Sequence, residues 1–135
     1  MNVEQRPPRC GDVWTVEDEN VILHAGGRVQ KGPRPVLILT AASLDMAALG
    51  VANVVPLSTS GRPDLYTFPL ERCYEELAPD FKPDPNSHAI INWYQPIEIR
   101  FFRKFRGRLS EQCQIAIKLL IQQSVLGIAD YDVDL

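Results

Sequence analysis

Eleven prolines are spread through the 135 residues, and they limit what the chain can fold into. They make up about 8% of the sequence, against a usual share of roughly 5%. Proline has no backbone N–H, so it is tolerated in the first turn of a helix, at strand edges and in turns, and it breaks helix interiors. The prolines therefore favour short strands and many loops over long helices.

The composition is that of an ordinary globular chain, with 45% apolar and 23% charged residues. A chain of this length buries roughly two thirds of its unfolded surface, which is enough for one core. No run reaches the roughly 18 apolar residues of a membrane span, and the first ten residues lack the apolar centre of a secretory signal. The net charge of -3 gives no overall attraction to nucleic acid. We expect one domain over residues 1–135, with tails at about 1–9 and 128–135, in the cytoplasm and away from membranes.

The cysteines and histidines do not form a recognisable site. The chain has an odd number of cysteines, Cys10, Cys73 and Cys113, and no two of them form a CxxC motif. We therefore interpret them as reduced cytoplasmic thiols. His24 and His88 lack the spacing of zinc ligands, and we assign neither a role. Glycine motifs for dinucleotides or phosphate loops and the serine nucleophile motif are absent. We therefore expect no metal and no cofactor.

Short alternating or apolar runs predict a series of strands. Residues 12–16 alternate polar and apolar side chains, and residues 35–40 form an apolar run after a proline. The predicted strands are 12–16, 21–24, 35–40, 52–57, 65–70, 89–94 and 98–101. Helical turns are predicted at 41–49 and 71–77, and a proline-rich excursion at 78–87.

Ser110 is predicted to cap the one convincing helix. Glu111 stands in its first turn, and Gly127 follows as a stop signal. The apolar residues that recur at helical spacing are Cys113, Ile117, Leu120 and Val125.

These elements predict a mainly β fold with a C-terminal helix, built as a small, mostly antiparallel barrel or curled sheet. We expect the strands around Val13, Val36, Val54 and Ile91 to share one sheet, with the helix packed on it.

Six short segments form a pattern through their order and spacing. They are CGDVW at 10–14, GGRVQKG at 26–32, RPVLILT at 34–40, VVPLSTS at 54–60, YQP at 94–96 and GRLS at 107–110. Over about residues 9–127 this pattern resembles the MazF/PemK toxins of bacterial toxin–antitoxin pairs. The resemblance implies an SH3-like barrel of the PemK/CcdB kind that forms a homodimer. It also implies a flexible antitoxin tail that blocks the groove.

The activity implied by the resemblance is cleavage of single-stranded RNA at short sequences without a metal ion. The 2′-hydroxyl attacks the adjacent phosphate and leaves a cyclic phosphate and a 5′-hydroxyl. In family members, the arginine before PVL and the hydroxyl residue after VVPL carry much of the site. Those positions are Arg34 and Ser58 in this chain, with Thr59 and Ser60 adjacent.

The chemistry of these side chains suits that reaction. Transphosphorylation needs a fixed cation against the developing charge and hydrogen bonds to the phosphate. Arg34 offers a planar donor fork, and the hydroxyl of Ser58 can hold a nonbridging oxygen. We predict that these two residues are catalytic. The predicted RNA-binding residues are Arg28, Lys31, Thr59, Ser60, Asn92 and Tyr94.

Three positions depart from residues found in some family members. Tyr94 stands where some have an acidic residue that is proposed to handle a proton, and tyrosine is a poor base at neutral pH because its reference pKa is about 10. Asn92 and Arg28 stand where some have arginine and histidine. An active nuclease would then need another proton acceptor, and we expect Trp93 and Tyr94 to form a barrel wall or a dimer contact rather than to act in catalysis.

Two classes of function therefore stay open. The first is a toxin that cuts single-stranded RNA as a homodimer and is bound by a cognate antitoxin peptide. The second is a catalytically silent family member that keeps the barrel as a binding or regulatory module. A gyrase poison on the same barrel is a further alternative, and it would not need Arg34 as a phosphate ligand.

Residues 100–108 hold five of the fourteen basic residues, interleaved with phenylalanines. Such a run can bind single strands through phosphate attraction and base stacking. The alternative is that the phenylalanines lie in the core and the charges form a solvated face, and both descriptions can hold together.

Overall fold

The computed structural model describes residues 6–22, 32–59, 66–125 and 127. Its helices and strands are β1 (Asp12–Glu17), β2 (Pro33–Ile38), α1 (Met46–Leu49), β3 (Val51–Ser58), β4 (Thr67–Pro69), β5 (Tyr74–Leu77), β6 (His88–Ile90), β7 (Gln95–Glu98), β8 (Phe102–Leu109) and α2 (Glu111–Leu120). Turns of 3₁₀ helix lie at Asp18–Asn20, Ile91–Trp93 and Ile99–Phe101, and a π-helical turn, Ile121–Val125, continues α2. In these ranges we find no helix with the length and apolar character to span a membrane.

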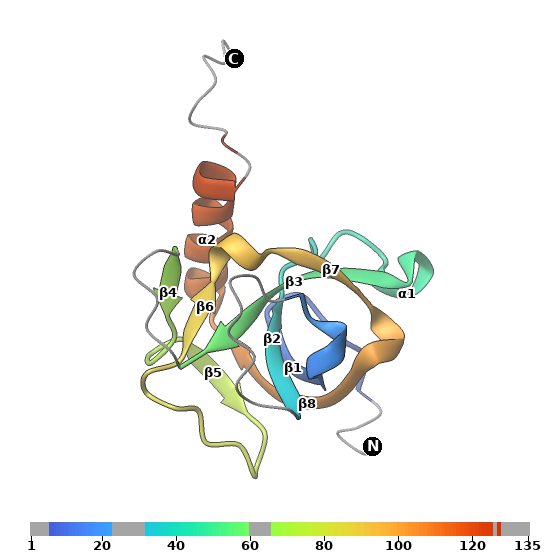
Figure 1. Ribbon diagram of the computed structural model, residues 1–135, viewed down its shortest axis with the longest axis horizontal. Coiled ribbons are helices and arrows are strands. Elements are labelled where there is room, and N and C mark those ends of the chain that lie inside the picture. Colours follow the sequence, from blue (N-terminus) through green and yellow to red (C-terminus); the bar gives the residue numbers. More distant parts are fainter. Residues whose placement is uncertain (1–5, 23–31, 60–65, 126, 128–135) are drawn as a thin grey trace.

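The strands form a curled, antiparallel sheet in the order β4–β6–β3–β2–β1–β8–β5, and β7 also pairs with β3. β3 is the branch point, because its residues 54–56 pair with β2 whereas Leu57 and Ser58 pair with β6. Figure 1 shows β1, β2, β3, β7 and β8 curving into a half-barrel, with α2 beside β4 and β6. The predicted fold class is confirmed.

Alternation along β2 and β3 separates two buried clusters, because successive side chains in a strand point to opposite faces. One face carries Leu37 and Val55, and the other carries Val36 and Val54. The helix-side cluster consists of Val13, Leu37, Leu39, Val55, Leu57, Leu70, Cys73, Ala89, Ile91, Leu109, Ile117 and Ile121. The barrel cluster consists of Trp14, Val16, Val21, Val36, Ile38, Met46, Ala52, Val54, Ala78, Ile97, Phe102 and Phe105.

α2 begins where the sequence predicts. Ser110 is its N-cap, and its Oγ accepts a hydrogen bond of 3.3 Å from the backbone N of Cys113. Ile117 is buried in the helix-side cluster, and Cys113 and Leu120 pack against that cluster from partly buried positions. Val125, which was predicted on the same face, is 38% exposed. The helix is therefore fixed through its first three turns, and its apolar stripe ends before Val125.

Several predicted elements are wrong. Residues 71–77 are not a helical turn, because Tyr74–Leu77 is β5 and pairs with β8. Residues 98–101 are not a strand: β7 ends at Glu98 and a 3₁₀ turn follows. The strand predicted at 89–94 ends at Ile90 and gives way to the 3₁₀ turn Ile91–Trp93, so Ile91 belongs to the core but not to the sheet.

Two further differences concern strand ends. The predicted strand 35–40 begins earlier and ends earlier, as β2. Of the predicted strand 21–24, Val21 and Ile22 are not in a strand, and residues 23 and 24 lie outside the described residues.

The interpretation of all three cysteines as reduced thiols is also wrong. Cys73 and Cys113 form a disulfide, with Cα atoms 5.7 Å apart. Because β5 pairs with β8, Cys73 lies close to the start of α2. The backbone N of Ser110 donates a hydrogen bond of 2.7 Å to the carbonyl O of Cys73. Cys10 is free and buried. The two bonded cysteines are 40 residues apart, so only tertiary structure reveals the pair.

Candidate functional site

Arg34, near the start of β2, forms an ion pair with Asp18. Its Nε donates to Oδ1 of Asp18 over 2.7 Å, and the two side chains are 18% and 9% exposed. Val16 is the strand partner of Arg34, so the 3₁₀ turn that follows β1 brings Asp18 next to the guanidinium. Nη1 and Nη2 of Arg34 form no hydrogen bond to a residue that the structure describes. The carboxylate therefore orients the fork and leaves its terminal nitrogens for a ligand.

Ser58 lies on the same face of the β2–β3 ribbon as Arg34. The last matched pair at this end is Val36 with Pro56, and each candidate residue lies two positions beyond it. Side chains two positions apart in a strand point to the same face of the sheet. Arg34 and Ser58 therefore point to the face that carries the barrel cluster. Beyond Pro56, β3 leaves β2 to pair with β6, and exposed Thr59 follows. The predicted catalytic pair thus shares one face at the point where the two strands part.

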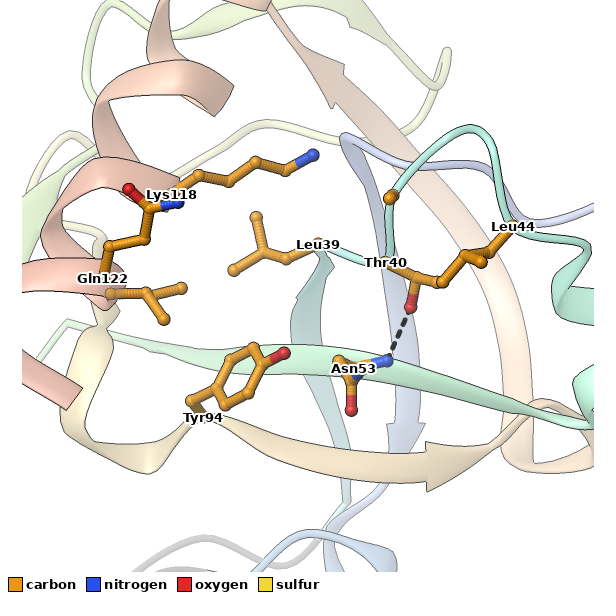
Figure 2. Close-up of a pocket in the computed structure, with 9 residues that line it drawn as sticks. Leu39, Thr40, Leu44, Asn53, Tyr94, Lys118 and Gln122 are labelled. Atoms are coloured by element: carbon orange, nitrogen blue, oxygen red, sulfur yellow. Dashed lines mark hydrogen bonds between the residues drawn. The ribbon is translucent and has the colours of Figure 1, made fainter. Parts of the chain in front are cut away.

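Tyr94 lies on the opposite face. It packs against the helix-side cluster and lines a pocket of about 310 Å³. Figure 2 shows its ring and the Lys118 side chain on either side of Leu39. The other lining residues are Thr40, Ala41, Leu44, Asn53, Ile121 and Gln122. The structure therefore separates Tyr94 from Arg34 and Ser58 by the thickness of the sheet.

Asn92 and Trp93 occupy the 3₁₀ turn after β6. Oδ1 of Asn92 accepts a hydrogen bond from the backbone N of Tyr66, so this side chain fixes the entry to β4. Trp93 is 7% exposed, which leaves little of its ring for a contact with another subunit.

Three predicted RNA-binding residues, Arg28, Lys31 and Ser60, lie outside the described residues. Gln95, the middle residue of the YQP segment, holds the backbone of Ile22. Its Oε1 accepts from the backbone N of Ile22 over 2.8 Å, and its Nε2 donates to the carbonyl O of Ile22 over 3.0 Å. This buried amide therefore fixes the backbone at Ile22.

The basic residues of 100–108 are each matched by a carboxylate. Lys104 and Arg106 both contact Asp80, and Arg108 contacts Asp12 and Glu75. Arg100 pairs with Glu98 and Arg103 with Glu17. Phe102 and Phe105 are buried in the barrel cluster, so their rings are not available for base stacking. The structure therefore favours the description in which the phenylalanines lie in the core and the charges lie on a solvated face.

Asp12 is a fully buried carboxylate at the other end of β1 from the partner of Arg34. Its Oδ2 accepts from the backbone N of Arg9 (2.9 Å) and from Nε1 of Trp14 (3.3 Å), and its Oδ1 accepts from Nη1 of Arg108 (3.0 Å). Burial raises the pKa of this carboxyl above its ordinary value, although the three donors oppose the shift. These contacts join the N-terminal segment, β1 and β8, which is a structural role.

The described ranges contain no group of three or more histidine, cysteine or acidic side chains placed to hold a metal ion. No protein-family model matches the sequence, and no curated protein matches it either. Solved structures do match. MazF from Deinococcus radiodurans aligns with a TM-score of 0.63 at 14% identity, over 91% of this chain and 99% of that one.

The chain has the MazF fold. The MazE–MazF complex from Deinococcus radiodurans gives a TM-score of 0.63 at 14% identity, over 91% of this chain and 98% of the matched chain. The Mycobacterium tuberculosis toxin MazF-mt6 gives 0.58 at 17% identity, over 90% and 99%. The MazF fold thus extends over nearly the whole chain, with few identical residues.

Proposed function

We propose that this protein is the toxin of a type II toxin–antitoxin system and a metal-independent endoribonuclease that cuts single-stranded RNA. The observation that carries the proposal is the ion pair in which Asp18 orients the Arg34 guanidinium. Arg34 lies on the same face of the sheet as Ser58, in a chain with the MazF fold. An oriented guanidinium that shares a face with a hydroxyl suits a phosphate diester better than a small neutral substrate.

In this mechanism the 2′-hydroxyl of the RNA attacks the adjacent phosphorus, and the bond to the 5′-oxygen breaks. Charge grows on the nonbridging oxygens as the phosphorane forms. Nη1 and Nη2 of Arg34 stabilise that charge, and the Ser58 hydroxyl donates to one oxygen. Asp18 acts through Arg34, because its bond to Nε fixes the plane of the fork. Arg28, Lys31, Thr59 and Ser60 contribute contacts to the flanking phosphates.

The partners of this toxin are a second copy of the chain and an antitoxin peptide, in the cytoplasm. α2 supplies a surface for the second copy, because Ile115 and Leu119 on its outer side are 51% and 50% exposed. Apolar side chains one helical turn apart form a stripe that a symmetric partner can cover. The MazE–MazF complex supports an antitoxin partner by analogy of fold.

A catalytically silent binding module is the second candidate. Asp18 already matches the charge of Arg34 at 2.7 Å, and a matched guanidinium attracts a phosphate less strongly than a free one. In that case the same face would bind RNA or a peptide without cutting it.

The test is incubation of the purified protein with a long single-stranded RNA in EDTA. The proposal predicts cleavage whose upstream products end in a 2′,3′-cyclic phosphate and whose downstream products begin with a 5′-hydroxyl. Binding of RNA without any cleavage supports the silent module instead.

A further inference from the structure

One buried polar atom of the described ranges has no hydrogen-bond partner, and it belongs to His88. It is the Nδ1 of the imidazole, the only buried side-chain nitrogen or oxygen in those ranges that lacks a partner. Native proteins pair nearly all such atoms because an unmade bond costs stability, so an exception calls for an explanation. A catalytic imidazole is one such explanation.

The position of His88 brings it to the candidate site. In the pairing of β3 with β6, His88 stands directly opposite Ser58. Side chains opposed in this way have Cβ atoms about 5 Å apart on one face of the sheet. The next pair, Leu57 and Ala89, belongs to the helix-side cluster. His88 and Ser58 therefore face the other side, as Arg34 does.

We propose that His88 is the proton-transfer residue of this site, an inference that rests on the proposed function. Imidazole is the side chain best suited to exchange a proton near neutral pH. Since Nδ1 is the buried nitrogen, Nε2 is the one that meets substrate. Nε2 takes the proton of the 2′-hydroxyl as the bond from the 2′-oxygen to phosphorus forms. The bond from phosphorus to the 5′-oxygen then breaks, and that oxygen takes a proton from solvent.

Three other acid–base groups of the described residues are less well placed for this step. Tyr94 lies on the opposite face of the sheet, and Asp18 is bonded to Arg34. Asp12 lies at the far end of β1 and holds three donors. In the part of the chain that the structure describes, His88 stands opposite Ser58 in the β3–β6 pairing, and its Nδ1 has no such partner.

The test measures single-turnover RNA cleavage by wild type, His88→Ala and His88→Phe, with melting temperatures for each. The matched control is His24→Ala, the only other histidine in the chain. We expect both His88 variants to lose at least 100-fold in rate and the control to stay within about threefold of wild type. Added imidazole should restore at least tenfold to His88→Ala and nothing to His88→Phe, whose ring fills the space. Because Nδ1 has no partner to lose, His88→Phe should melt no lower than wild type.

The outcomes separate this inference from the proposed function. If the wild type cuts RNA and His88→Ala does so at the wild-type rate, the inference fails and the proposed function stands. If His88→Ala is slow and imidazole restores nothing, while both His88 variants melt lower, His88 is structural and the inference also fails. If the wild type cuts no RNA under any condition, the proposed function itself fails, and this inference falls with it.

Discussion

Nε of Arg34 and Oδ1 of Asp18 are 2.7 Å apart, and the pair is mostly shielded from solvent. The bond uses one of the five N–H groups of the guanidinium, so it sets the direction of the fork without occupying its outer edge. A buried ion pair adds little net stability in general, because desolvation of both charges offsets their attraction. We therefore interpret this pair as orientation of a ligand-binding group, which makes Asp18 a positioning residue.

The first prediction tests that interpretation. Asp18→Ala should lower the kcat for RNA cleavage on the order of 10- to 100-fold and change KM little, because a loose Arg34 still meets the phosphate but no longer holds its transition state. In an Arg34→Ala background the same substitution should have almost no further effect. Glu19→Gln, an exposed neighbour, is the control and should behave as wild type. Additive losses in the double variant would show that Asp18 acts independently of Arg34.

The second prediction concerns Tyr94, which packs on the helix-side cluster. Tyr94→Phe should leave the kcat for RNA cleavage within about threefold of wild type, because the hydroxyl lies on the opposite face of the sheet from Arg34. Steady-state kinetics on a short RNA check this. A drop in kcat of more than tenfold with an unchanged melting temperature would place the phenol in the reaction.

The disulfide between Cys73 and Cys113 supports the third prediction. Closing a loop of this length should stabilise the native state by about 4 kcal/mol, mainly by restricting the unfolded chain. Urea unfolding with and without reductant measures that loss in the wild type. The double variant Cys73→Ser/Cys113→Ser should not respond to reductant, and Cys10→Ser should respond as the wild type does. A wild type that is equally stable in both conditions would contradict a bonded pair in solution.

The fourth prediction follows from the raised pKa of Asp12. The native carboxyl holds its proton at a higher pH than the unfolded one, so protonation of Asp12 favours the native state. Its contribution to the free energy of unfolding is complete below about pH 4, the ordinary range of an unfolded aspartate, and is lost as the pH rises through the raised native pKa. Asp12→Asn lacks this dependence.

Urea unfolding of both proteins between about pH 3 and pH 7 checks the sign. The free energy of unfolding of the wild type minus that of Asp12→Asn should fall as the pH rises. A difference that grows with pH would mean that the Arg108 and Trp14 bonds outweigh burial, and that the native pKa of Asp12 is lowered.

The helices and strands that could be predicted from the sequence are those whose signals lie within their own segments. β1 was predictable from alternation, and α2 from its Ser110 cap, because the evidence lies within each segment. β8 was missed because its charges obscure a period-two pattern and its pairing with β1 contains register shifts. The strand at 89–94 was overextended because the Asn92 side chain bonds to Tyr66, a contact that no local pattern reveals.

In the candidate site, too, some residues could be identified from the sequence and others only from the tertiary structure. Arg34 and Ser58 were named from a resemblance and share a face, whereas no pattern in the sequence singled out Asp18 as a partner of Arg34. The register that pairs Val16 with Arg34 is what selects Asp18 from its acidic neighbours. The roles predicted for Arg28, Lys31 and Ser60 stay predictions, because these residues lie outside the described ranges.

The most direct test of the account is the single-turnover rate of RNA cleavage in EDTA by wild type, Arg34→Ala and Arg34→Lys. Arg72→Ala, an exposed arginine with no carboxylate partner among the described residues, is the control. We expect Arg34→Ala to lose on the order of 100-fold or more, as when an oxyanion donor is removed. Arg34→Lys should recover little of this, since an ammonium cannot reproduce the fork, and Arg72→Ala should match wild type. Cleavage by Arg34→Ala at the wild-type rate would contradict the account.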